Sequence, residues 1–148
     1  MASKILLDAN ILLDLTLKRE AYKEASEVFE LIIAGRLKAY ITPSILHITG
    51  YWLTKSYGAA KAKKILLTLL VDITIIDMSH EMALTALHSS IDDIEDALQY
   101  YTAIHHKIDF FISRDKRLQK SAIPVLPVYS PGELIKEFQG NVSGSQSP

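Results

Sequence analysis

The sequence predicts one α/β domain of three layers, α/β/α, in which a central, mostly parallel sheet of about five strands lies between helices. Short apolar runs, of which residues 5–7 are the first, alternate with longer segments whose apolar residues recur at helical spacing. The composition, 49% hydrophobic and 22% charged, is that of a globular protein. We expect the domain to cover residues 1–139, and the polar, Gly/Ser-rich tail at 140–148 to be disordered.

The expected strands are short and rich in apolar and β-branched residues. The run Ile5-Leu6-Leu7 is unbroken and apolar, which is typical of a strand buried on both faces inside a parallel sheet. Further strands are expected at residues 38–41, 73–76, 110–113 and 125–128. The strand at 73–76 is β-branched along most of its length, and we expect it to be buried as well.

Helices are expected where a capping residue precedes apolar residues at helical spacing. Thr42-Pro43-Ser44 is typical of a helix start, and Ser79 is expected to cap a helix that contains Met82 and Leu87. We expect Asp92 to cap another helix, with Glu95 as its reciprocal partner. The other expected helices cover about residues 21–33, 44–56, 59–70, 92–106 and 132–138.

Composition excludes several classes of function. A formal net charge of −1 argues against a protein that coats nucleic acid through charge alone. The absence of cysteine excludes disulfides, thiolate metal sites and a cysteine nucleophile. The N-terminus lacks the pattern of a signal peptide, and no apolar run approaches the roughly 18 residues that span a bilayer. We therefore expect a soluble protein of the cytoplasm.

Three aspartates occur where a parallel sheet places its ligands. Asp8 and Asp115 follow two expected strands, and Asp96 lies in the first turn of the helix before the second of them. Because the carboxyl ends of parallel strands meet at one edge of the sheet, these side chains can converge. Oxygen ligands of this kind suit Mg²⁺ or Mn²⁺. The alternative is that each aspartate is a local helix cap, an acid at a helix start or a loop residue.

Three blocks resemble those of PIN domains, in the same order and over nearly the whole chain. They are Asp8-Ala9-Asn10-Ile11-Leu12-Leu13-Asp14, Asp93-Ile94-Glu95-Asp96-Ala97-Leu98 and Phe111-Ile112-Ser113-Arg114-Asp115. The resemblance implies a metal-dependent ribonuclease, and many small members are toxins of VapBC-type toxin–antitoxin pairs. It implies that Asp8, Asp96 and Asp115 are the catalytic metal ligands, with Asn10, Asp93 and Ser113 in supporting roles.

The chain departs from the family at one position. The family usually has a further acid in the helix after the second strand, and that position falls at Ile48. No acid occurs between Arg36 and Val71. Losing one carboxylate should weaken the binding of a divalent cation. The neighbouring His47 points about 100° away on a helix, so a structural or surface role is favoured for it.

Other residues suggest partners. The basic residues Arg114, Lys116 and Arg117 are candidates for nucleic-acid binding, and so are Lys61, Lys63 and Lys64, although both groups fit solvated surfaces as well. Trp52 and several tyrosines could stack on bases, with core or partner packing as the favoured alternative. His105-His106 does not have zinc-ligand spacing. The expected partners are RNA, an antitoxin protein and a second copy of the chain, which the apolar 45–70 hairpin could bind.

Two rival functions stay open. One is a PIN-like module that binds nucleic acid or protein but has lost catalysis with the acid at Ile48. The other is a phosphotransfer domain of the receiver type, which lacks the expected lysine after a late strand. RNA hydrolysis with Mg²⁺ or Mn²⁺ separates the nuclease from both.

Overall fold

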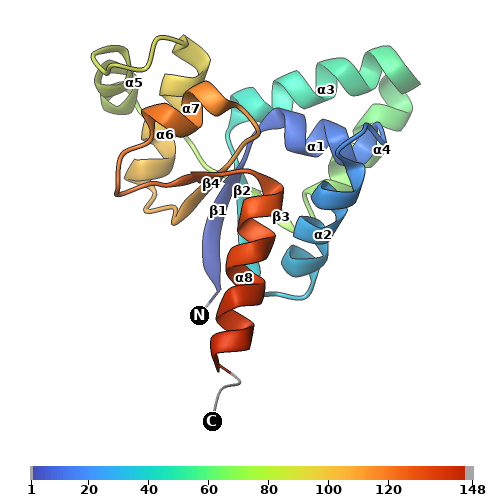
Figure 1. Cartoon of the computed structure of the whole chain (residues 1–148). Helices are drawn as coiled ribbons and strands as arrows, with labels where there is room; N and C mark the ends of the chain where they lie inside the picture. Colours follow the sequence, from blue (N-terminus) through green and yellow to red (C-terminus); the bar gives the residue numbers. More distant parts are fainter. Residues whose placement is uncertain (1, 146–148) are drawn as a thin grey trace.

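Five parallel strands and eight helices make up the part of the chain that the structure describes. The computed structural model describes residues 2–145, and the side chains of residues 2–139. In chain order the elements are β1 Ser3–Leu7, α1 Ala9–Thr16, α2 Tyr22–Ile33, β2 Leu37–Ile41, α3 Pro43–Tyr57, α4 Ala59–Leu69, β3 Ile73–Ile75, α5 His80–Leu87, α6 Ile94–His105, β4 Phe110–Ile112, α7 Lys116–Ser121, β5 Val128–Tyr129 and α8 Pro131–Ser145 (Figure 1). The predicted α/β/α class is confirmed. Among the described helices, none combines the length and apolar character that crossing a membrane requires.

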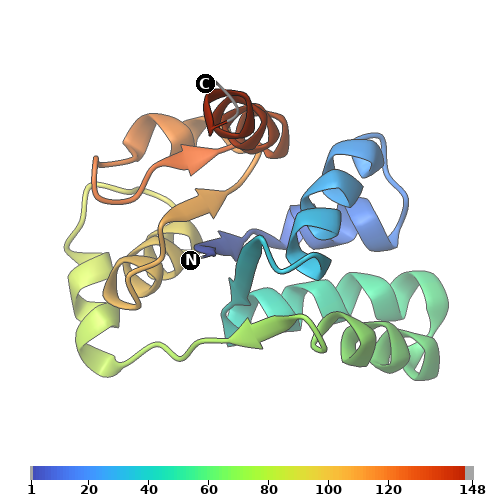
Figure 2. The ribbon, with the colours of Figure 1, turned by 90° about the horizontal axis from the view of Figure 1, so that it is seen from below.

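The sheet places β1 at its centre, as predicted. The strand order is β3-β2-β1-β4-β5, and every neighbouring pair is parallel. The chain therefore moves outward from β1 to β3 and then crosses back to β4 and β5. Helix α1 packs on α2 and α3, α3 packs on α4 and α8 packs on α2, whereas α5 packs on α6. Figure 2 shows these two groups of helices on opposite sides of the sheet.

The core is built around β1. Ile5, Leu6 and Leu7 are each fully buried, which agrees with the unbroken apolar run that predicted the strand. On the neighbouring strand Phe111 is fully buried and stacks on Tyr100 of α6, with ring centroids 6.3 Å apart. Each side chain of this size stabilises the fold by roughly 1.5–3 kcal/mol through burial. The carboxyl end of β1 is thereby held in a rigid environment.

Helix α1 was not predicted from the sequence. It begins directly after β1, and Asp8 occupies its N-cap position without donating or accepting a side-chain capping bond. Five of its eight residues are apolar, and the run Ile11-Leu12-Leu13 suits a strand as well as a helix, so the local pattern does not distinguish the two. Its buried face, formed by Ile11, Leu12 and Leu13, packs against the core.

Several predicted elements differ from those in the structure. The N-cap of α6 is Asp93 rather than Asp92, and its Oδ1 accepts a 2.9 Å hydrogen bond from the Asp96 amide. β5 begins at Val128 rather than at residue 125, since Pro124 and Pro127 have no amide hydrogen to give to a ladder. β3 is an edge strand that ends at Ile75 rather than at residue 76. Ile73 and Ile76 are buried, as predicted, but Thr74 and Ile75 are exposed, so the prediction of a strand buried along its length was wrong.

Helix α8 is longer than the predicted 132–138. It runs from Pro131 to Ser145 and so includes residues 140–145, which we expected to lie outside the last helix. The remaining tail residues, 146–148, lie outside the described part. The division into a domain at 1–139 and a disordered tail therefore stays a prediction.

Candidate active site

The carboxyl edge of the sheet brings Asp8 and Ser113 together through strand register. Leu7 pairs with Ile112, and the Asp8 amide donates to the Ile112 carbonyl at 3.1 Å. The next residue on each strand is therefore a neighbour of the other, and the Ser113 hydroxyl donates to Asp8 Oδ2 at 2.9 Å. The same hydroxyl accepts a 3.1 Å bond from the Asp115 amide. Ser113 is fully buried, so it ties the loop after β4 to Asp8.

Asp115 is the N-cap of α7. Its Oδ1 accepts hydrogen bonds from the amides of Arg117 at 2.9 Å and Leu118 at 3.4 Å. The local capping role that the sequence left open is therefore real. A cap of this kind also fixes the carboxylate in place, because both amides belong to the first turn of the helix.

The start of α6 crowds acidic groups together. The pKa of Asp96 is raised to about 7, first by burial and then by repulsion from Asp93, Asp115, Asp8 and Glu95, in that order. Asp93, Asp96 and Asp115 line one cleft of about 160 Å³, together with Arg117. The structure thus places Asp96 and Asp115 at a common cleft, with Asp8 near enough to repel both.

The environment of Asp8 also disfavours its charged form. Burial is the largest cause of its raised pKa, the hydrogen bond from Ser113 opposes the rise, and the charge of Asp115 contributes to it. The charged form of a carboxylate whose pKa is raised in this way is stabilised by a nearby positive charge. The electrostatics therefore suit a cation, whereas the predicted sharing of one ion by the three aspartates stays a prediction.

The acidic side chains at this edge are not close enough together to bind one metal ion. Among the side chains of residues 2–139, no three His, Asp or Glu groups are placed so that they could hold one ion together. Their chemistry nevertheless fits, because the donors are carboxylates, which Mg²⁺ and Mn²⁺ prefer. A cation at this edge would require these side chains to move closer to one another.

Glu95 is a site residue that the sequence analysis missed. Burial raises its pKa, and the charges of Asp8 and Asp93 add to the rise. The expected role as a reciprocal capping partner was wrong, because Glu95 Oε1 accepts a 3.0 Å bond from Nε2 of the buried Gln99. Both residues line a second cavity of about 440 Å³, which extends to Thr42, Ser44, Asp77 and Thr102. In the sequence, only the position of Glu95 directly before Asp96 indicated that it could belong to the site.

Arg114 has a structural contact that the sequence did not indicate. Its Nη2 lies 2.9 Å from Oδ1 and 2.8 Å from Oδ2 of Asp14. The Asp14 side chain is 1% exposed, whereas that of Arg114 is 43% exposed. The pair joins the end of α1 to the loop that carries Ser113 and Asp115.

The other candidates lie at varied places. Asn10 is exposed on α1, and Lys116 and Arg117 are exposed on α7 beside the cleft. Ile48 is partly buried and packs against the main core, while His47 is exposed. His106 Nε2 lies 2.8 Å from the Asp77 carbonyl oxygen, which gives this histidine a local structural contact.

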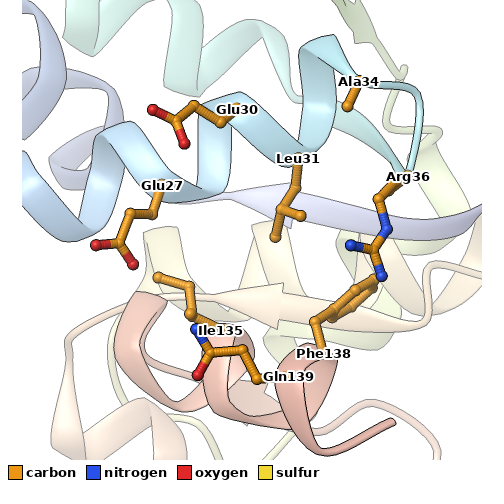
Figure 3. A pocket seen from close by; sticks show the side chains of 8 residues that line it. All are labelled: Glu27, Glu30, Leu31, Ala34, Arg36, Ile135, Phe138 and Gln139. Carbon is orange, nitrogen blue, oxygen red and sulfur yellow. The ribbon is translucent and has the colours of Figure 1, made fainter. Parts of the chain in front are cut away.

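A further cavity lies apart from these groups. It measures about 760 Å³ and lies between α2 and α8, with Glu27 and Glu30 near one end and Arg36 beside Phe138 at the other (Figure 3). Arg36 directly precedes β2, so this end of the cavity lies toward the amino ends of the strands. It is separate from the acidic edge.

Comparison with known proteins gives a family and several similar folds. The family model described as PIN domain matches residues 4–117. A toxin–antitoxin complex from Klebsiella pneumoniae is 25% identical with a TM-score of 0.65, covering 86% of this chain and 97% of that one. VapBC2 from Rickettsia felis, bound to a DNA fragment from its promoter, is 18% identical with a TM-score of 0.65, over 86% and 98%. Mycobacterium tuberculosis VapC20, a sarcin–ricin loop cleaving toxin, is 12% identical with a TM-score of 0.64, over 80% and 95%. No curated protein matches the chain in sequence.

Proposed function

This chain belongs to the PIN domain family, and from that premise we propose that it is a metal-dependent ribonuclease that hydrolyses RNA at the carboxyl edge of its sheet. The observation that carries the proposal is the crowding of Asp8, Asp93, Asp96 and Asp115 at this edge. Such mutual repulsion persists only where the surrounding fold imposes it, and it is relieved by a cation. The edge is also where parallel α/β sheets bind their ligands.

Asp8, Asp96 and Asp115 would hold Mg²⁺ or Mn²⁺. When bound, such an ion polarises a phosphodiester and lowers the pKa of a water molecule. Ser113 orients Asp8 through its 2.9 Å hydrogen bond, and Asp93 fixes the start of α6 by capping the Asp96 amide. Asn10, which is exposed on α1, is proposed to orient the ligands or a bound water molecule.

Lys116 and Arg117 are proposed to contact the RNA backbone. Both are exposed at the start of α7, and Arg117 lines the cleft that Asp96 and Asp115 share. Arg114 could reach RNA only with the part of its guanidinium that Asp14 does not engage, so its main role is to hold the loop.

The biological setting that we propose is a toxin–antitoxin pair. The Klebsiella pneumoniae structure is a toxin–antitoxin complex, and the Rickettsia felis structure is a VapBC2 complex. These likenesses support an antitoxin protein as a partner of this chain. A homodimer stays a prediction, which sedimentation at micromolar concentration would test.

The second candidate function is a PIN module that binds RNA or protein without cleaving it. Two observations favour it: no three acidic side chains in the described part could hold one ion as they stand, and no acid occurs between Arg36 and Val71, where the further family acid is expected at Ile48. In that case RNA or protein binding survives EDTA while hydrolysis is absent.

Hydrolysis of a mixed RNA pool tests the proposal. We expect cleavage with Mn²⁺ or Mg²⁺, none with EDTA, and recovery when Mn²⁺ is added in excess. Asp96→Asn, purified in the same way, controls for contaminating nucleases because it keeps the fold and removes one proposed ligand. Equal cleavage by both proteins, or no cleavage by the wild type at any Mn²⁺ concentration, would reject the nuclease assignment.

A further inference from the structure

We propose that the hairpin formed by α3 and α4, residues 43–69, is an arm that binds single-stranded RNA beyond the acidic edge. Its lysines pair with phosphates, and its exposed aromatic rings stack on bases. This inference rests on the proposed ribonuclease function, since it concerns how the same substrate is held.

The charge of the hairpin is opposite to that of the remaining chain. It contains Lys55, Lys61, Lys63 and Lys64 and no aspartate or glutamate, in a protein whose net charge is −1. The remainder of the chain therefore carries −5 at pH 7. All four lysines are exposed. A surface of one sign on a protein of the other sign attracts a polyanion to that surface alone.

Aromatic rings lie beside two of these lysines, Lys55 and Lys61. Tyr51 is 51% exposed, Trp52 is 43% exposed, and the two rings meet edge to face with centroids 5.3 Å apart. Lys55 Nζ lies 5.3 Å from the Tyr51 centroid and 5.5 Å from the Trp52 centroid. Near the turn, Lys61 Nζ lies 4.4 Å from the ring centroid of the exposed Tyr57. Cations beside aromatic faces are the combination that single-stranded nucleic-acid sites use.

The hairpin begins at the acidic edge and leads away from it. Thr42, which caps α3 by accepting from the Ile45 amide at 3.2 Å, follows directly after β2. α3 has 15 residues and is therefore about 22 Å long. It packs on α1, which starts after Asp8, and Figures 1 and 2 show the hairpin projecting to one side of the sheet. An RNA cleaved at Asp8 and Asp96 could extend along this arm.

RNA fits this surface better than a second copy of the chain. A two-fold interface through the hairpin would place the same lysines near their own copies, and like charges there are repelled. Burying the lysine-covered rings would also remove ammonium groups from water without a counter-charge. A phosphate backbone supplies that charge at every nucleotide.

The test measures RNA binding without cleavage. Fluorescence anisotropy is recorded with a labelled single-stranded RNA of roughly 20 nucleotides in EDTA, at several salt concentrations. We expect Lys61→Ala/Lys63→Ala/Lys64→Ala to weaken binding at least about tenfold and to reduce the slope of log K against log salt by about 2. The matched control, Lys23→Ala/Lys38→Ala/Lys136→Ala, removes the same charge from exposed positions elsewhere. If the two triple variants lose RNA affinity equally, the loss reflects net charge and not the hairpin, and the proposal is overturned.

Trp52 separates stacking from charge. Trp52→Ala is expected to weaken binding at least about fivefold with an unchanged salt slope, and Trp52→Phe to restore most of the loss. Circular dichroism verifies that each variant is folded. Unchanged RNA affinity in Trp52→Ala, or a shift from dimer to monomer in the lysine variant by sedimentation, overturns the arm in favour of a protein interface.

The two proposals fail in different ways. If the wild type binds RNA through the hairpin but cleaves none with Mn²⁺, the nuclease assignment fails and the arm stands. If the lysine variant cleaves long RNA with an unchanged KM, the arm fails and the nuclease stands. A trinucleotide substrate, too short to reach from the acidic edge along the hairpin, should be cleaved equally by the wild type and the lysine variant.

Discussion

Asp96→Asn should cleave RNA at least ~100-fold more slowly than the wild type and yet be the more stable protein at pH 8 when no metal is present. The loss follows because a proposed ligand of the catalytic ion loses its charge, and even residues that only orient metal ligands are worth 10–100-fold. The gain follows because Asp96 stands among carboxylates that repel it. If Asp96 served only to stabilise the fold, Asp96→Asn would instead be less stable than the wild type.

The pH dependence of that gain has a definite direction. The pKa of Asp96 is raised from 3.8 to about 7 in the folded protein, so between these values the folded state binds a proton that the unfolded state has lost. The stabilisation from that proton is complete below pH 3.8 and is lost as the pH rises through about 7. Wild type and Asp96→Asn should therefore melt alike near pH 4, diverge progressively as the pH rises toward about 7, and keep a constant difference above it.

The expected difference is modest because Asp96 is only partly buried and solvent screens its charge. Thermal unfolding in EDTA at pH 8 should show Asp96→Asn melting roughly 2–4 °C above the wild type. Mn²⁺ should then raise the melting temperature of the wild type and leave the variant nearly unchanged. If Asp96→Asn is less stable at pH 8 without metal, the carboxylate is not under repulsion and the site model fails.

Arg114→Ala should destabilise the fold by about 3 kcal/mol, since it leaves the carboxylate of Asp14 buried without its cation. Asp14 is 1% exposed, and the guanidinium of Arg114 is its ion-pair partner. For a domain of this size the melting temperature should fall by roughly 6–12 °C. The loop that carries Ser113 and Asp115 should loosen with it, because Arg114 lies between them.

A matched variant and a double variant sharpen this prediction. Arg117→Ala removes the same charge from an exposed position three residues away and should change stability by less than about 0.5 kcal/mol. Asp14→Asn/Arg114→Ala should recover part of the loss, because the buried charge is then absent as well. Arg114→Ala melting at the wild-type temperature would show that the pair contributes nothing.

The sequence by itself determined the fold class, the central strand and three of the acidic positions. Ile5-Leu6-Leu7 predicted β1 because a strand covered on both faces must be apolar at every position, and no tertiary information is needed to read that. The resemblance in three ordered blocks likewise predicted the family that the match over residues 4–117 identifies. Local rules failed where two structures compete for the same residues. The apolar run of α1 fits a strand or a helix, and Asp92 and Asp93 are equally good caps.

Only the tertiary structure decided which polar groups meet. Ser113 binds Asp8 because the Leu7–Ile112 register makes them neighbours across 105 positions of sequence. Arg114 pairs with Asp14, 100 positions away, while its side chain remains 43% exposed. The packing of α6 against the sheet puts Glu95 near Asp8. These contacts cannot be predicted from residue spacing along the chain. They depend on strand order, on register and on the desolvation of charged groups, all of which arise only when the sheet and its two helix layers have assembled.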